Sequence, residues 1–162
     1  MRPFVRHLLP ISLLLVLTGC GGQPVHTEGN QPPLTPSRAN HSQQQLLTLA
    51  LQQQGISYRY GGSHPATGFD CSGLIQFSYR QIGKRIPRTT QAQYQASRPI
   101  PLSQILPGDL LFYETEGRRP GHVALYLGRG EMIHAPSSGK QVKINRLNNP
   151  YWRTRLLAAG RF

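Results

Sequence analysis

Apolar residues recur at helical spacing in the first half of the chain. Between Gln43 and Gln54, Leu46, Leu47 and Ala50 fall on one face together with Leu49 or Leu51, with Ser42 in the N-cap position and Gly55 as a stop. A second such pattern starts at Cys71 and ends at Gly83, and its apolar members are Leu74, Ile75, Phe77, Tyr79 and Ile82. These spacings predict two helices, and a shorter one is expected from Thr90 to Gln95.

The second half of the chain is typical of β-structure instead. Alternating, β-branched and aromatic residues predict five strands: Asp109–Tyr113, Gly121–Gly128, Glu131–Ala135, Gln141–Asn145 and Arg155–Ala159. Pro107-Gly108 predicts a turn, Arg129-Gly130 a hairpin turn, and the charged segment from Glu114 to Gly121 a loop. Helices followed by an antiparallel meander indicate the α+β class.

The N-terminus has the features of an export signal. Basic residues precede an apolar run from Leu8 to Leu17, which is shorter than a membrane span. The run ends in Leu17-Thr18-Gly19-Cys20, which resembles a bacterial lipoprotein box. Residues 1–19 are then a signal peptide, and Cys20 is lipidated. The alternatives are an ordinary signal peptide with a chance cysteine, or an uncleaved anchor.

Composition separates the remaining chain into two parts. Residues 20–41 are rich in Gly, Pro and Gln and are expected to form a flexible linker behind the lipidated Cys20. Residues 42–162 suffice for one ordinary domain. Gly21 after the cysteine resembles the outer-membrane default, so we expect a lipoprotein of that membrane that faces the periplasm.

The charge of the chain narrows its partners only slightly. The net charge is +12, and loss of Arg2 and Arg6 with the signal peptide leaves +10. Export and the scatter of the basic residues argue against a nucleic-acid partner. Anionic wall or membrane surfaces are the better match.

Cys71 is the cysteine that the mature chain has available for chemistry. The chain has two cysteines, and lipidation of Cys20 leaves Cys71 without a disulfide partner. Asp70 precedes it and is suited to cap the helix. A thiol in the first helical turn is expected to have a pKa below its ordinary ~8.5. The alternative is a small buried thiol that packs the helix against a sheet.

Two histidines could serve that thiol. His122 and His134 lie on neighbouring predicted strands, close enough for their rings to bond directly. His122 shares a sheet face with Ala124 and Tyr126, and the three groups converge if the cysteine helix packs across that face. The alternative for each histidine is a satisfied, partly buried strand residue. His64, in a loop, is left out of the site.

Six short motifs occur together in a recognisable order: Tyr58-Arg59-Tyr60-Gly61-Gly62, Gly68-Phe69-Asp70-Cys71-Ser72-Gly73, Ile86-Pro87-Arg88-Thr89-Thr90, Leu106-Pro107-Gly108-Asp109-Leu110, Gly121-His122-Val123-Ala124 and Met132-Ile133-His134-Ala135. In this order they resemble the NlpC-type family of bacterial cell-wall cysteine peptidases. The resemblance covers about Ser42 to Phe162. Together with the lipoprotein signal, the motifs resemble in particular the small NlpC and Spr lipoproteins of that family.

The resemblance implies a papain-like α+β core and assigns roles to the residues. Cys71 would be the nucleophile, His122 the general base and later the acid, and His134 the residue that orients the base. Tyr58 would line the site, and the oxyanion would be held by the backbone N–H of Cys71, with the Tyr58 hydroxyl as a candidate second donor. Ser72 and Arg88 are candidate pocket residues. Asp70 is assigned to capping and Asp109 to a turn.

The implied reaction is hydrolysis of amide bonds in peptidoglycan stem or cross-linking peptides, through an acyl-enzyme and without a metal or other cofactor. The expected partners are stem peptides and, through the lipid, the membrane, with the protein a monomer. Two alternatives stay open: a non-catalytic lipoprotein that binds the wall, and an amidase or acyltransferase with another acyl substrate. The bond cut is either γ-D-glutamyl–diaminopimelate within a stem or D-alanyl–diaminopimelate between stems.

Overall fold

The computed structural model describes residues 36–162, except residue 138. The predicted signal peptide, Cys20 and most of the predicted linker lie outside these residues. Within the described part of the chain, no helix has the length and apolar character that crossing a membrane requires.

The first helix differs from its prediction at both ends. Helix α1 runs Pro36–Leu51, so Ser42 lies inside it and is not its N-cap. Proline is tolerated in the first turn of a helix, where its missing N–H has no intrahelical partner, so the helix can include the polar residues before Ser42. At the other end the chain turns after Leu51 and reaches Gly55, whose φ is +83°. The helix therefore extends into the segment predicted as linker.

The cysteine helix agrees with its prediction. Helix α2 spans Cys71–Gln81, and the Asp70 carboxylate caps it by accepting the Gly73 N–H at 2.7 Å. Two shorter helices follow, α3 at Thr90–Ala96 and α4 at Pro150–Arg153, and a 3-10 turn spans Leu102–Gln104. The sequence predicted α3 but missed α4, which is a single turn.

Six strands form one antiparallel sheet in the order β3-β8-β4-β5-β6-β7. Their bounds are Arg98–Ile100 (β3), Leu110–Thr115 (β4), Arg118–Gly128 (β5), Glu131–His134 (β6), Lys143–Arg146 (β7) and Leu156–Arg161 (β8). A separate short pair, β1 (Ser63–His64) and β2 (Gly68–Phe69), precedes α2. The α+β class and the meander from β4 to β7 are confirmed, whereas β1, β2 and β3 were not predicted.

The charged segment before His122 is a hairpin and not a loop. Thr115 pairs with Arg118, and the two residues between them, Glu116 and Gly117, have φ of 51° and 70°. Positive φ at both central residues is the geometry of a tight two-residue hairpin turn, in which charged side chains can point to solvent. The same geometry recurs at Arg129-Gly130, with φ of 54° and 75°, where a hairpin turn was predicted.

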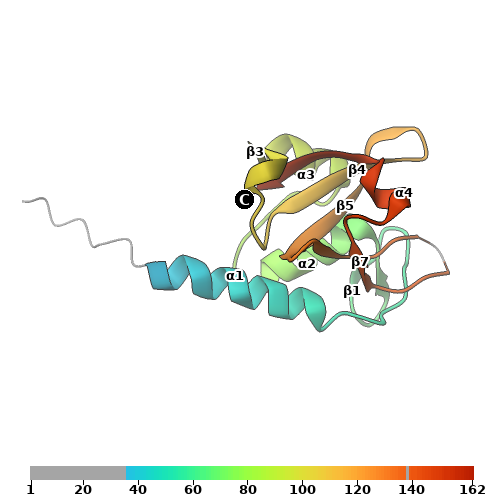
Figure 1. Cartoon of the computed structure of the whole chain (residues 1–162). Helices are drawn as coiled ribbons and strands as arrows, with labels where there is room; N and C mark the ends of the chain where they lie inside the picture. The colour runs from blue at the N-terminus through green and yellow to red at the C-terminus, as the bar shows by residue number, and fades with distance from the viewer. Residues whose placement is uncertain (1–35, 138) are drawn as a thin grey trace, which may run out of the picture. The chain divides into compact units, whose positions relative to one another are not determined.

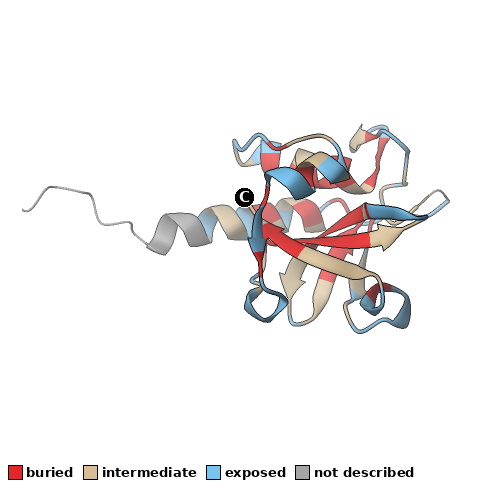
Figure 2. Cartoon of the chain, turned by 90° about the horizontal axis from the view of Figure 1, so that it is seen from above, coloured by how far each residue is buried: buried red, intermediate tan, exposed pale blue. Residues whose placement is uncertain are grey.

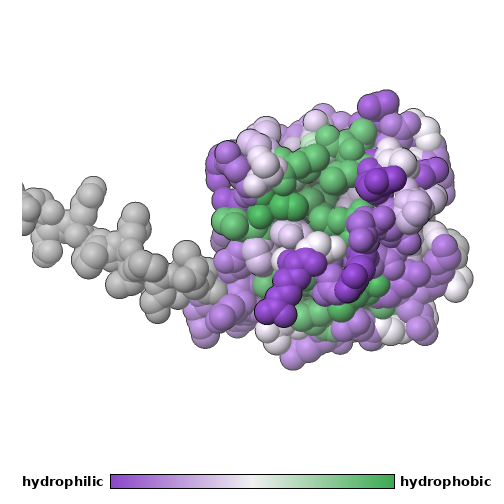
Figure 3. Space-filling model, viewed as in Figure 1, coloured by the Kyte–Doolittle hydropathy of each residue, from purple (hydrophilic) through white to green (hydrophobic). Residues whose placement is uncertain are grey.

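The two faces of the sheet are covered by different elements (Figures 1 and 2). Helices α1 and α2 pack on one face, where Leu74 and Ile75 meet Val123 and Leu125. The other face carries Tyr113, Ala124 and Met132 and is covered in part by Trp152 of α4. Apolar side chains remain visible on this second face (Figure 3).

The cysteine helix therefore packs on the face opposite to that of His122 and Ala124, and not across the His122 face. The physical reason is that Val123 and Leu125 are wholly apolar and match the apolar face of α2.

Candidate active site

Cys71 lies at the start of α2, in the wall of a cavity of about 600 Å³. The thiol is half-buried, and its Sγ is 3.5 Å from the Thr90 hydroxyl oxygen of α3. The start of the helix lies very close to the preceding loop. A Cβ at Gly73 would overlap the carbonyl oxygen of Gly62, so only glycine fits there. Glycine at this position thus permits the close approach of the loop to the helix that carries the thiol.

The two predicted histidines bond to each other. His122 comes from β5 and lines the same cavity as Cys71, while His134 at the end of β6 is fully buried. The His122 Nε2 is 2.8 Å from the His134 Nδ1. This bond uses Nε2 of His122 and leaves its Nδ1 available to the cavity. In a neutral ring whose Nδ1 can accept a proton, the hydrogen is on Nε2 and is donated to His134.

Trp152 packs on the face of the His122 ring and limits its orientation. Its indole stacks on the His122 ring, with centroids 5.0 Å apart and planes inclined by 30°. It also meets His134 edge-on, at 4.8 Å. No pattern in the sequence indicated this role, although Trp152 is the only tryptophan of the chain and follows an Asn-Pro helix start. A rigid aromatic wall on the sheet face opposite α2 thus supports the imidazole pair.

The proton affinities of the site are set mainly by burial. Burial lowers the pKa of His122 and of His134 below the ordinary histidine value, and the charges of His122, Lys143 and Lys140 lower the pKa of His134 further. Burial also raises the pKa of the Cys71 thiol, against the opposing hydrogen bonds from Thr90 and from the backbone of Val123 and Ser72. The predicted low thiol pKa is therefore wrong: the resting site favours a neutral thiol beside a neutral imidazole.

Asp70 does more than cap α2. Its Oδ2 accepts the Arg88 Nη2 hydrogen at 2.7 Å and the Gly61 N–H at 2.9 Å. Arg88 also donates to the Ser72 hydroxyl at 3.0 Å and to the Gly62 carbonyl at 3.2 Å. Ser72 and Arg88, the candidate pocket residues, both line the cavity, but the guanidinium is largely occupied in holding the loop, the cap and the helix start together.

Two groups that can donate to a negative oxygen belong to residues that line the cavity. The Cys71 N–H lies in the first turn of α2, where an N–H has no intrahelical acceptor. Tyr58 lines the cavity, and burial, followed by the charge of Cys71, raises the pKa of its hydroxyl. Tyr58 therefore keeps its hydrogen and can donate it.

His64 lies apart from the other two predicted histidines. His64 of β1 is exposed, accepts the Ala66 N–H and does not line the cavity. Among the residues that the structure describes, no group of three or more His, Cys, Asp or Glu side chains is arranged to hold a metal ion.

Comparison with known proteins identifies the family of this domain. The family model described as "NlpC/P60 family" matches residues 55–161. The chain is 43% identical over 119 residues to the murein DD-endopeptidase MepH of Escherichia coli, covering 71% of this chain and 44% of that protein. It is 41% identical over 118 residues to the bifunctional muramidase/DL-endopeptidase CwlT of Bacillus subtilis, covering 72% of this chain and 35% of that protein.

The fold has solved relatives as well. A crystal structure described as similar to lipoprotein, of the NLP/P60 family, from Staphylococcus aureus superposes with a TM-score of 0.70 at 36% identity, covering 75% of this chain and 41% of that one. The chain spans less than half the length of the curated relatives MepH and CwlT. The family model covers most of the described residues, including α2 with Cys71 and the strands β5 and β6 with the two histidines. The chain therefore belongs to the NlpC/P60 family.

Proposed function

We propose that this protein is a cysteine peptidase that hydrolyses amide bonds in the peptides of peptidoglycan. The observation that carries the proposal is the shared cavity wall of Cys71 and His122, with His134 bonded behind the imidazole. The names of MepH and CwlT, which describe cell-wall endopeptidases, support the substrate class.

The geometry supports a general-base mechanism. As Cys71 Sγ attacks the scissile carbonyl carbon, His122 Nδ1 takes the thiol proton, and His134 Nδ1 accepts a hydrogen bond from His122 Nε2. Proton transfer accompanies the attack because the neutral thiol and imidazole are favoured at rest. The Cys71 N–H and the Tyr58 hydroxyl stabilise the negative oxygen of the tetrahedral intermediate.

Collapse of that intermediate breaks the carbon–nitrogen bond. His122 returns the proton to the leaving amine, and the acyl group remains on Cys71 as a thioester. A water molecule, deprotonated by His122, then attacks the thioester, which releases the carboxylic acid and restores the thiol. The whole reaction consumes one water molecule and needs no other reactant.

Digestion of peptidoglycan sacculi tests the proposal. The purified protein should release new amines, and the Cys71→Ala variant should release none, because the acyl-enzyme cannot form. Mass spectrometry of the fragments identifies the bond, since cleavage within a stem and cleavage between stems leave different muropeptides. Equal release by both proteins refutes the peptidase. Binding without release supports a wall-binding lipoprotein, and other fragment masses support an amidase or acyltransferase.

We also propose that Cys20 is lipidated and holds the domain at the outer membrane, facing the periplasm. The proposal rests on the Leu17-Thr18-Gly19-Cys20 motif, which lies outside the described residues. Cys20→Ser should move the protein from the membrane fraction to the soluble fraction of the cell envelope. Unchanged membrane association of the variant contradicts lipidation at this cysteine.

A further inference from the structure

A second cavity, of about 290 Å³, lies next to the catalytic one. The two cavities share four lining residues: Thr115, Glu116, Pro136 and Ser137. These residues come from the β4–β5 hairpin and from the loop after β6. The rest of the second lining consists of Lys140, Lys143, Asn145, Asn149, Tyr151 and Trp152, and we call this space the basic cavity. A peptide that extends past these four shared residues would occupy both cavities.

The basic cavity carries cations that are free to bind a ligand. Lys140 and Lys143 are exposed at the cavity, and Glu116 is the acidic residue of its lining. Among the described residues the ion pairs are Arg88–Asp70, Arg119–Glu114 and Arg161–Asp109, so neither lysine belongs to one. Two ammonium groups beside asparagine amides in a recess suit a carboxylate.

Trp152 places this cavity on the leaving-group side of the catalytic cysteine. The indole lines the basic cavity and stacks on the His122 ring. His122 must give its proton to the leaving amine, which therefore lies within hydrogen-bond reach of the imidazole. Tyr58, Ser72 and Arg88 line the catalytic cavity but not the basic one. The peptide that departs with the amine thus extends toward Lys140 and Lys143.

We propose that the basic cavity binds a carboxylate of the residue that supplies the leaving amine. This inference rests on the proposed function, because both candidate bonds in peptidoglycan have diaminopimelate on the amine side. Diaminopimelate has two amino-acid ends, so a carboxylate belongs to the leaving portion in either case. Lys140 and Lys143 would select it by charge, with the Asn149 amide as an additional donor.

A matched pair of synthetic peptides tests the inference. The two peptides contain the bond identified in sacculi and differ only in whether the diaminopimelate carboxylates are free or amidated. The wild-type protein should prefer the free carboxylate about tenfold in kcat/KM, and this ratio should fall as salt is added. In the double variant Lys140→Gln/Lys143→Gln the ratio should approach one, and in Lys140→Glu/Lys143→Glu it should invert.

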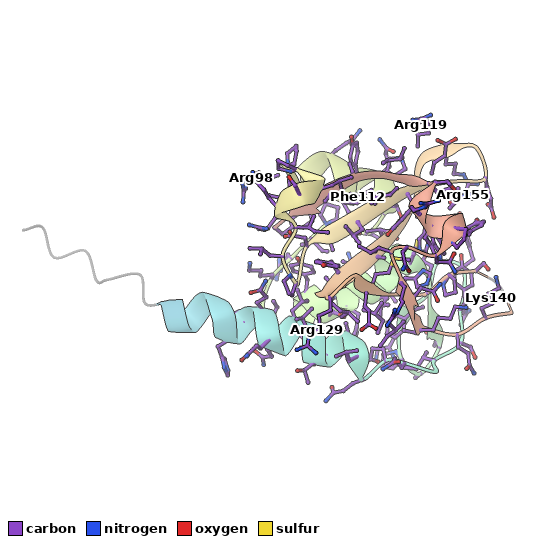
Figure 4. The ribbon with its side chains drawn as sticks, in the orientation of Figure 1. Arg98, Phe112, Arg119, Arg129, Lys140 and Arg155 are labelled. Atoms are coloured by element: carbon purple, nitrogen blue, oxygen red, sulfur yellow. The ribbon has the colours of Figure 1, made fainter. Side chains whose placement is uncertain are left out.

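Arg129→Gln is the control for loss of a positive charge. Arg129 is exposed at the β5–β6 turn, and Figure 4 shows it well apart from Lys140, so this variant should keep the wild-type ratio. A wild-type ratio near one, or a ratio unchanged in both lysine variants, overturns the basic cavity as a carboxylate site and leaves the peptidase proposal standing. Failure of the wild-type protein to cleave either peptide or sacculi overturns both.

Discussion

His122→Ala is expected to lower kcat/KM by a factor of about 10⁴ while the protein stays folded. In the proposed mechanism, the variant removes the group that takes the proton from Cys71. This loss is severe here because burial raises the pKa of the thiol, so the cysteine does not ionise readily by itself. A helix-start cysteine with a thiolate already formed would depend less on its base.

The measurement is the rate of amine release from sacculi, together with alkylation of Cys71 and circular dichroism. Slow alkylation that speeds up only at high pH would show that the thiol of the variant is present and protonated. Turnover within tenfold of wild type would contradict the role of His122 as base.

His134→Asn is the matched variant for the orienting role. An asparagine carbonyl can replace the His134 Nδ1 as acceptor of the hydrogen on His122 Nε2, a bond that measures 2.8 Å in the wild-type structure. Measurable activity is therefore expected in His134→Asn, and a much larger loss in His134→Ala. A folded but inert His134→Asn would contradict the orienting role.

The free energy of unfolding should fall by roughly 4 kcal/mol between pH 7 and pH 5. Burial holds the pKa values of His122 and His134 well below the ordinary ~6.5. Below pH 6.5 the unfolded chain therefore binds protons that the folded chain does not. The contribution of each buried neutral ring to the free energy of unfolding is fully present above pH 6.5. It is lost as the pH falls toward the pKa of that ring in the folded protein.

Urea denaturation at pH 7 and at pH 5 measures this dependence. The His134→Asn variant should lose roughly half of the difference, since only one of the two rings remains. Equal stability at both pH values would contradict the burial of two neutral imidazoles.

Local features of the site could be predicted because their hydrogen bonds join residues close together in the chain. Asp70 caps the helix that starts one residue later, and its bond to the Gly73 N–H needs only the residue types and their spacing. The turn at Arg129-Gly130 has the same local origin, and with strand periodicity it places His122 and His134 on adjacent strands. Asp109 accepts the Leu106 N–H, which confirms the predicted turn.

Other features depend on segments that are distant in the chain. Asp109 also pairs with Arg161, and Asp70 with Arg88, so both carboxylates bind partners that no local pattern indicates. The hairpin at Glu116-Gly117 was hidden because charged residues are as common in loops as on exposed hairpins, and only strand pairing distinguishes the two.

The sequence by itself determined the family resemblance, the cysteine on a capped helix start and the two histidines on neighbouring strands. Only the tertiary structure decided that α2 covers the face opposite His122, that Trp152 stacks on the His122 ring and that two lysines line a cavity next to that of Cys71. It also reversed the expected pKa of Cys71. The reason is that burial is a property of the packed molecule: the helix start favours an anion locally, but desolvation by surrounding segments outweighs it.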